Sequence, residues 1–507
     1  MSAGHAVRAA TLRGTQAMAV TAEVDLSGGI PGMTIVGMPD SAVLEARSRI
    51  RCALRASGFE IPRLHVTVNL APSDVRKQGT GFDLPVAVGI LAAQGEIPTA
   101  GLDGCLFVGE LALDGGVCDV RGALAYALLA RELGLRVVGS RGLARAVASL
   151  GLPDVDSVGL SSLSQLRRGV AELGAEPVAA GAVAAAPAES GPDYADVIDQ
   201  EAAKRAFVVA AAGGHGLLMV GPPGAGKTML ARRMPSILPE LADDERLEAM
   251  LVHSVCALPL DALARGLRPF RAPHHSVSRA GLVGGGSPVT PGEASLAHRG
   301  VLFLDELPEF APSVLQSLRQ PMEDGEVRLV RADGAYAFPC AFQLVAAANP
   351  CPCGHAGDRG HACRCAPGEV ERYQGRVGGA LLDRIDVFVG VARPEASRVI
   401  RGARGTCSAQ MRAEVSAARE FCSWRVARGV GAGTSGVSSL GLTSEASAAL
   451  ERMATRLSLG GRAIARTARV ARTVADLAGR EEVSAADVAE ACAYRNRLGG
   501  GEGDGGR

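Results

Sequence analysis

Residues 221–228 read GPPGAGKT, a glycine-rich stretch that constrains the fold more than any other part of the chain. It fits the pattern G-x-x-x-x-G-K-T, follows the apolar run HGLLMV and opens the helix-like segment TMLARRM. In this context glycines let backbone N–H groups surround phosphates at the start of a helix, Lys227 reaches the outer phosphates, and Thr228 holds Mg²⁺. The predicted phosphate-binding residues are Gly221, Pro222, Pro223, Gly224, Ala225, Gly226, Lys227 and Thr228.

Two later strand-like runs also end in polar side chains. VLFLDELPEF has four apolar residues before Asp305 and Glu306, and FQLVAAAN ends in Asn349. Asp305 is expected to act through Mg²⁺ and Glu306 to polarise an attacking water. Asn349 can orient the same water if its strand lies beside the other two. The alternatives are a solvated acidic turn and an ordinary residue at the end of a strand. With the phosphate loop upstream, the pattern favours nucleotide hydrolysis.

The order of strand-like and helix-like segments predicts several domains in this chain of 507 residues. Strands that alternate with helices after the loop predict a parallel α/β sheet. The predicted parts are an α/β or α+β domain at 1–170, an Ala/Gly/Pro-rich linker at 171–192, the nucleotide-binding core at 193–395, a helical lid at 396–498 and a disordered tail at 499–507.

Charge and composition exclude some functional classes. Lys plus Arg equals Asp plus Glu, 53 against 53, so the chain has no large positive field for nucleic acid and any contact must be local. No apolar run is long enough to span a membrane, and no export signal is recognisable at the N-terminus. We therefore expect a soluble cytoplasmic protein without a membrane partner. There the 12 cysteines would stay reduced, and clustered ones would be metal ligands.

The stretch NPCPCGHAGDRGHACRC contains four clustered cysteines. Cys351, Cys353, Cys363 and Cys365 form C-x-C-x9-C-x-C, two close pairs separated by a glycine-containing loop. Four thiolates suit tetrahedral Zn²⁺, and a site with four protein ligands would be structural. The single-residue spacing within each pair is shorter than usual, and His355 or His361 could replace a thiolate. Reduced, unliganded cysteines and redox or iron–sulfur use remain alternatives.

The same order of motifs resembles the AAA+ ATPases. RPFRAPHHSVSRAGLVGGG, PGEASLAHRGVLFLDELPEF, NPCPCG, LLDRID and RVARTVADLAG narrow the resemblance to the magnesium-chelatase-like ComM/YifB family. It runs through the whole chain apart from the linker and tail. It implies a ring, usually a homo-hexamer, with ATP between neighbouring subunits. Arg384 matches the arginine finger that reaches the neighbour's ATP, and Arg462 matches the second sensor of the lid. Asp199 stands where relatives usually have glycine.

Other interpretations of these arginines stay open. Arg384 could form an ion pair with Asp383 or Asp386. Arg462, Arg466 and Arg469 share one helical face because they are four and three residues apart, and such a basic face could simply be solvated.

The first domain resembles the Lon protease domain and ribosomal protein S5. The Lon nucleophile is a serine and its base a lysine, but the matching segment GTGFDLP has Gly81 and Phe82 where the serine would be, and VRGALAYALLA has no lysine. Lys77 and Thr80 lie nearby in the sequence. Without the reactive pair we expect no peptidase activity, and a role in assembly or substrate binding instead.

Two segments of the core resemble insertions that contact DNA in related ring ATPases. One carries His274, His275 and Arg279, and the other is a predicted hairpin with Arg328 and Arg331 on its first arm. Six copies of one or two arginines would give several phosphate contacts. The resemblance implies an ATP-driven helicase for single-stranded or branched DNA in natural transformation or recombination, with recombinase machinery as a partner. The alternatives are a chelatase-type remodelling ATPase, acting on a protein or in metal insertion, and a nucleotide-dependent peptidase.

Overall fold

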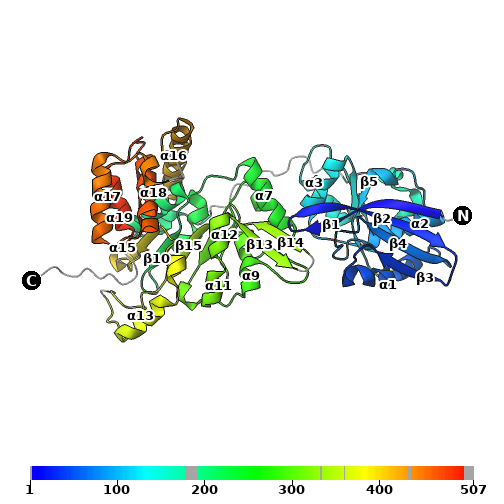
Figure 1. Ribbon diagram of the computed structural model, residues 1–507, viewed down its shortest axis with the longest axis horizontal. Helices are drawn as coiled ribbons and strands as arrows, with labels where there is room; N and C mark the ends of the chain where they lie inside the picture. The colour runs from blue at the N-terminus through cyan, green and yellow to red at the C-terminus, as the bar shows by residue number, and fades with distance from the viewer. Residues whose placement is uncertain are drawn as a thin grey trace, which may run out of the picture.

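The computed structural model describes residues 3–176, 191–331, 334–358, 360–402, 404–431 and 436–495. Three regions follow one another along the long axis of the molecule: an N-terminal domain, a central domain and a group of C-terminal helices (Figure 1). The expected disordered tail lies outside the described residues, as do residues 177–190 of the expected linker.

The N-terminal domain is built on a seven-stranded mixed sheet with the strand order β3-β4-β2-β1-β5-β8-β9. β1 and β2 form a long antiparallel pair, whereas β5, β8 and β9 run parallel. Helix α2 is buried along almost its whole length. The strands are β1 (Ala3–Arg13), β2 (Gln16–Ser27), β3 (Gly32–Val36), β4 (His65–Ala71), β5 (Cys105–Phe107), β8 (Arg136–Ser140) and β9 (Ser157–Leu160), with the small pair β6 (Glu110–Leu111) and β7 (Val117–Cys118). The helices are α1 (Ser41–Ala56), α2 (Asp83–Gln94), α3 (Ala123–Leu133) and α4 (Arg141–Ser149).

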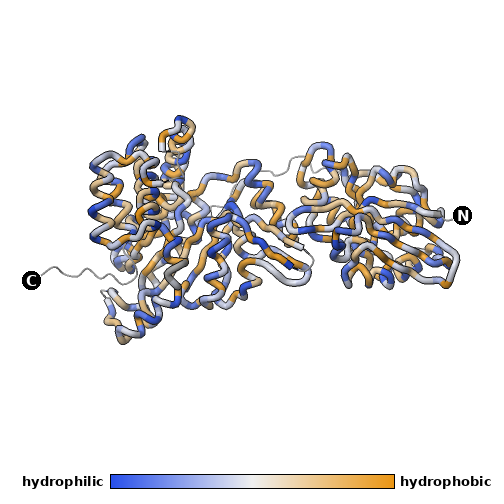
Figure 2. The backbone as a smooth tube through the Cα atoms, in the orientation of Figure 1, coloured by the Kyte–Doolittle hydropathy of each residue, from blue (hydrophilic) through white to orange (hydrophobic). Residues whose placement is uncertain are grey.

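The central domain contains a five-stranded sheet in which every pair is parallel, in the order β11-β12-β15-β10-β16. Its strands are short apolar runs, as expected of a parallel sheet buried on both faces, and apolar segments gather along the strands (Figure 2). They are β10 (Leu217–Val220), β11 (Phe270–Arg271), β12 (Val301–Leu304), β15 (Gln343–Ala348) and β16 (Val387–Gly390). The predicted α/β class with a parallel sheet is confirmed.

Helices and short turns cover this sheet and connect its strands. Helix α5 precedes the first strand, and α6 follows it directly. The helices are α5 (Glu201–Gly213), α6 (Lys227–Arg232), α7 (Asp243–Ser254), α8 (Asp261–Ala264), α9 (Arg279–Val283), α10 (Glu293–Leu296), α11 (Pro312–Gln316), α12 (Arg319–Asp324), α13 (Pro367–Gly375) and α14 (Gly379–Leu382).

The register of the sheet brings three strand ends together. Val220 pairs with Ala348, and Leu304 pairs with Ala346. Because the strands are parallel, the residues that follow β10, β12 and β15 meet at the carboxyl edge of the sheet, where α/β proteins form their ligand sites.

The predicted hairpin forms and contacts the N-terminal domain. β13 (Glu326–Arg331) pairs antiparallel with β14 (Gly334–Pro339), and the hairpin lies beside the end of β1 in Figure 1. Tyr336 Oη accepts a 2.6 Å hydrogen bond from Gln78 Nε2 of the N-terminal domain. A second contact joins α3 to α7, where Leu124 packs against apolar residues of the central domain. These residues are Leu241, Ala249, Met250 and Leu263.

The C-terminal region is helical, as predicted. Helices α16, α18 and α5 pack together, and α19 packs on α17 and α18. A buried ion pair joins two of the helices, with Arg425 Nε 2.9 Å from Asp476 Oδ1. The helices are α15 (Ala396–Ile400), α16 (Ser408–Ala427), α17 (Ser444–Arg456), α18 (Gly461–Leu477) and α19 (Ala485–Ala493). None of the helices in the described residues combines the length and apolarity that crossing a membrane requires.

Candidate active site

The glycine-rich loop lies where the sequence predicts it, between the end of β10 and the start of α6. Gly224 and Gly226 have φ values of 78° and 92°, left-handed conformations that glycine adopts without strain, and a Cβ at either position would meet open space. Gly221 has a different reason to be glycine, because a Cβ there would lie 2.0 Å from the carbonyl oxygen of Val391. The loop therefore has open space beside Gly224 and Gly226.

Lys227 is held over this loop by three acceptors. Its Nζ donates to the carbonyl oxygens of Gly221 and Pro222, at 2.6 and 3.0 Å, and to Oδ1 of Asn349, at 3.0 Å. Burial lowers the pKa of Lys227, although Asp305 and Glu306 oppose the shift. The predicted lysine and strand-end asparagine thus meet directly.

Thr228 and Asp305 form the second contact of the site. Thr228 Oγ1 donates a 2.6 Å hydrogen bond to Asp305 Oδ2, although the two residues come from different strand ends. A hydroxyl and a carboxylate are oxygen donors of the kind that Mg²⁺ takes in phosphate-loop proteins, together with phosphate oxygens and water. The residues present therefore fit Mg²⁺, and Thr228 and Asp305 are the side chains that would hold it.

Glu306 has a partner that sequence reasoning missed. Its backbone is left-handed, with φ at 51°, and its N–H donates to Asp305 Oδ1 at 2.9 Å. His275 Nδ1 lies 3.5 Å from Glu306 Oε2. The ring of His275 is also tilted against that of His274, with centroids 4.0 Å apart, and makes an edge-to-face contact with Phe310. His275 follows β11 and Glu306 follows β12, two neighbouring strands, so only the strand order could have indicated this contact.

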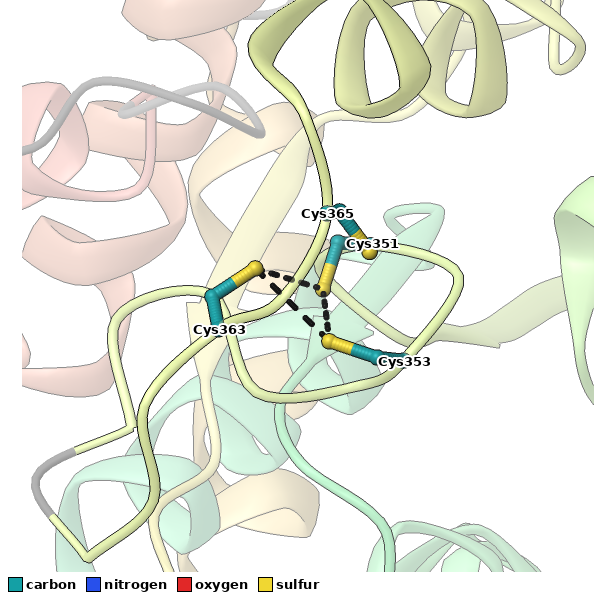
Figure 3. Close-up of side chains that lie close together, drawn as sticks. All are labelled: Cys351, Cys353, Cys363 and Cys365. Carbon is teal, nitrogen blue, oxygen red and sulfur yellow. Dashed lines mark hydrogen bonds between the residues drawn. The ribbon is translucent and has the colours of Figure 1, made fainter.

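The four cysteines converge as predicted (Figure 3). The Sγ atoms of Cys351, Cys353 and Cys363 lie 3.4 to 3.6 Å apart, and all four sulfurs lie within 4.8 Å of one another. Four sulfurs at about 2.3 Å from one tetrahedral ion would be about 3.8 Å apart. Backbone N–H groups of Arg364 and His355 help to lower the pKa of Cys353 to about 6, whereas desolvation and the neighbouring sulfurs raise the pKa values of Cys363 and Cys365. The fit to a metal thus rests on the spacing of the four sulfurs. The donor set therefore fits Zn²⁺.

The cysteine loop packs against the phosphate loop. Gly354, between the two cysteine pairs, has φ at 81°, and a Cβ there would lie 2.5 Å from Pro223 Cδ. The two histidines of the stretch form a separate group: His355 and His361 both contact Asp358, at 3.1 and 3.5 Å. Arg393, just beyond β16, lies 3.6 Å from the same carboxylate. The loop thus connects the phosphate loop to the segment that leads into the C-terminal helices.

Arg384 and Arg462, the two arginines predicted to contact ATP, lie away from the phosphate loop of their own subunit. Arg384 is buried and forms an ion pair with Glu323. The carbonyl oxygen of Arg384 lies next to Gly216, so Arg384 is at the amino end of β10. The phosphate loop follows the carboxyl end of the same strand, and the length of β10 separates the two ends by about 13 Å. Arg462 is exposed near the start of α18. Among the described residues, no hydrogen bond or ion pair joins Arg462 to the phosphate loop.

The structure also gives partners to the basic face of α18, to Asp199, and to Lys77 and Thr80 of the N-terminal domain. Arg466 forms an ion pair with Asp386 at 3.3 Å, so the predicted basic face is partly neutralised. Asp199 has φ at 64°, a conformation in which glycine is free of strain, and its carboxylate lies 2.9 Å from Arg398. In the N-terminal domain Lys77 is buried and donates to the carbonyl of Pro72, whereas Thr80 donates to Glu110 at 2.5 Å. Lys77 and Thr80 are thus engaged with different partners.

A parallel sheet that presents a phosphate loop, an acidic pair and an asparagine at one edge, followed by a helical region, defines an ATPase of the AAA+ class. Three family models match the chain: "Magnesium chelatase, subunit ChlI" at 193–399, "Subunit ChlI of Mg-chelatase" at 22–139 and "Magnesium chelatase, subunit ChlI C-terminal" at 405–495. The chain belongs to the magnesium-chelatase-like ComM/YifB family.

Full-length relatives support this assignment. The chain is 42% identical over 493 residues to "Competence protein ComM" of Haemophilus influenzae, which covers 95% of each chain. It is 41% identical over 506 residues to an uncharacterised protein of Mycobacterium tuberculosis, covering 98% of this chain and 99% of the relative. It is 39% identical over 497 residues to the uncharacterised protein YifB of Salmonella typhimurium, covering 95% of each chain. ATP and Mg²⁺ are the ligands that this ATPase family implies.

Proposed function

We propose that the chain is an ATP-driven DNA motor that assembles into a homo-hexameric ring and drives branch migration in recombination and in the integration of transforming DNA. The observation that carries this proposal is the identity of 42% to a protein named for competence, over 95% of both chains. The arrangement of the candidate active site supports the hydrolytic part. Single-stranded or branched DNA is the proposed substrate, with recombinase machinery as a partner and the cytoplasm as its location.

Each site residue has a proposed role in hydrolysis. Lys227 neutralises the outer phosphates. To do so, its Nζ leaves the carbonyl oxygens of Gly221 and Pro222 and donates to phosphate oxygens instead. Thr228 and Asp305 would hold Mg²⁺, which would supply positive charge to neutralise the phosphates. Glu306 polarises the attacking water and Asn349 orients it. The residues at 221–226 wrap the phosphates with their backbone N–H groups.

Two arginines are proposed to complete the site, and one of them, Arg384, acts across the subunit boundary. Arg384 lies too far from its own phosphate loop to contact it, which suits a finger offered to the neighbour's ATP. Arg462 is exposed in the lid and is proposed to sense the outer phosphate as the lid closes.

The four cysteines are proposed to hold a structural Zn²⁺ that fixes the path of the loop beside Pro223.

DNA is proposed to bind the two insertions of the central domain. His274, Arg279, Arg328 and Arg331 are all exposed, and the last two lie on one arm of the hairpin. In a ring of six copies these side chains would provide a circle of phosphate contacts, enough for salt-dependent binding by a chain with balanced charge.

A remodelling ATPase that acts on a protein partner or in metal insertion is the second candidate. The three family models favour it, because all of them describe a magnesium chelatase subunit. A nucleotide-dependent peptidase is not proposed, since Lys77 and Thr80 are engaged with different partners.

DNA binding separates the two candidates. The purified protein with ATP and Mg²⁺ is expected to migrate a four-way DNA junction, and Glu306→Gln is expected to bind the junction and ATP without migrating it. A hexameric protein that hydrolyses ATP but binds no DNA at low salt would overturn the motor and favour the remodelling ATPase. Lys227→Ala serves as the control that loses nucleotide binding itself.

A further inference from the structure

Arg384 and Glu323 form an ion pair at the edge of the parallel sheet opposite to the phosphate loop. Arg384 is only 8% exposed, whereas the side chain of Glu323 is 58% exposed. Glu323 lines a cavity of about 490 Å³. Three guanidinium groups, those of Arg268, Arg299 and Arg419, line the same cavity together with the acids Glu245 and Asp324.

These three guanidinium groups already have other partners. Arg268 donates to the carbonyl of Pro239, Arg299 pairs with Glu248 at 2.9 Å, and Arg419 donates to the carbonyl of Ala211. Glu323 is therefore left to pair with Arg384. Because Arg384 is buried, loss of this carboxylate would remove an acidic partner from a buried charge, which is costly and favours movement of the side chain toward solvent.

Glu323 also lies at the foot of the β13–β14 hairpin. It belongs to the last turn of α12, and β13 begins at Glu326 after a single left-handed glycine, Gly325, with φ at 67°. The far arm returns to the same point, because the N–H of Cys340 donates to the carbonyl oxygen of Gly325 at 2.8 Å. Both arms of the hairpin are thus anchored beside Glu323, and displacement of the hairpin would move this end of α12.

We propose that Glu323 is a positioning residue that retains Arg384 within its own subunit and releases it when DNA displaces the hairpin. The inference rests on the proposed function, since Arg384 is taken as the finger for the neighbour's ATP. While the ion pair holds, the charge of Arg384 is neutralised and its side chain is buried. Once the pair opens, the guanidinium can reach a phosphate across the subunit boundary. DNA on one subunit would thereby control hydrolysis in the next.

The test measures steady-state ATP hydrolysis by the full chain, with and without single-stranded DNA. We expect Glu323→Gln to raise the turnover number without DNA about fivefold, a population shift of about 1 kcal/mol, with KM for ATP unchanged. DNA should then stimulate the variant correspondingly less. Glu323→Asp keeps the charge but withdraws the carboxylate, so a smaller rise is expected, and this variant preserves the test if the glutamine variant fails to fold. The matched control is Asp324→Asn, the neighbouring exposed acid, which should behave as wild type.

A double variant identifies the residue that is released. Glu323→Gln combined with Arg384→Ala should fall to the rate of Arg384→Ala alone. An unchanged or reduced turnover number in both Glu323 variants, or a double variant that keeps the raised rate, would overturn the proposal.

Three outcomes separate this inference from the proposed function. Arg384→Ala at the wild-type rate would overturn the finger and the role of Glu323 together. A Glu323→Gln rise that requires Arg384, in a protein that DNA does not stimulate, would support retention of Arg384 by Glu323 but contradict both its release by DNA and the DNA motor. A protein that migrates a DNA junction but shows no rise in either Glu323 variant would contradict the role of Glu323 and leave the DNA motor standing.

Discussion

At the scale of single residues, the contact between His275 and Glu306 gives the clearest prediction. Asp305 fixes the backbone of Glu306, while His275 lies 3.5 Å from its carboxylate. We expect His275→Ala to lower the turnover number for ATP about tenfold, because a misplaced base loses the attacking water, with nucleotide affinity unchanged. Steady-state hydrolysis and binding of a fluorescent nucleotide measure the two effects.

His274→Ala is the control for this prediction. It removes an exposed neighbouring imidazole that contacts the ring of His275 and forms a hydrogen bond with Ser276. An equal loss of turnover in His274→Ala, or a loss of nucleotide affinity in His275→Ala, would contradict an orienting role for His275.

The sequence predicted the site residues that directly follow an apolar strand. It did not predict contacts that depend on which strands are neighbours in the sheet. The phosphate loop, Asp305 and Asn349 each follow a short apolar run, so the sequence places them at strand ends, and the parallel register brings them together. The partners of Glu306 and Arg384 come from elements far away in the sequence. β11 has only two residues, too few for a recognisable pattern, so its place beside β12 had no sequence signal.

At the scale of elements, the loop that carries the four cysteines packs against the phosphate loop, a contact that the sequence did not indicate. The spacing predicted the cluster, but the contact between Gly354 and Pro223 depends on how two loops pack. We expect Cys363→Ser to lose bound zinc and to bind nucleotide about tenfold more weakly, because the cysteine loop would no longer support the phosphate loop. Metal analysis and nucleotide titration measure the two quantities.

Cys52→Ser is the matched control, since Cys52 is exposed on α1 in the N-terminal domain. It should keep both the zinc content and the nucleotide affinity. Wild-type protein without zinc would contradict the metal site, and loss of zinc at unchanged affinity would contradict the coupling to the phosphate loop.

At the scale of the whole molecule, the N-terminal domain contacts the central domain at the hairpin, which is proposed to move, and at α7. Gln78 bonds to Tyr336 of the hairpin, and α3 packs on α7. The sequence indicated separate regions along the chain, because each has its own periodicity, but it gave no sign of this interface. Its apolar side chains look like ordinary core positions within their own helices. The N-terminal domain is therefore placed to restrain the hairpin, whose foot carries Glu323.

Leu124 allows this arrangement to be tested, because it is only 1% exposed and packs against the central domain. We expect Leu124→Asp to open the interface while both domains stay folded, since a carboxylate without a partner is costly in an apolar contact. Thermal unfolding should separate into two transitions, and small-angle scattering should give a larger radius of gyration. Leu133→Asp, at a 43% exposed position of the same helix, should change neither quantity. A single transition with unchanged scattering in Leu124→Asp would contradict this role of α3. The contacts of the hairpin would then hold the two domains together, with the hydrogen bond between Gln78 and Tyr336 as the restraint on the hairpin.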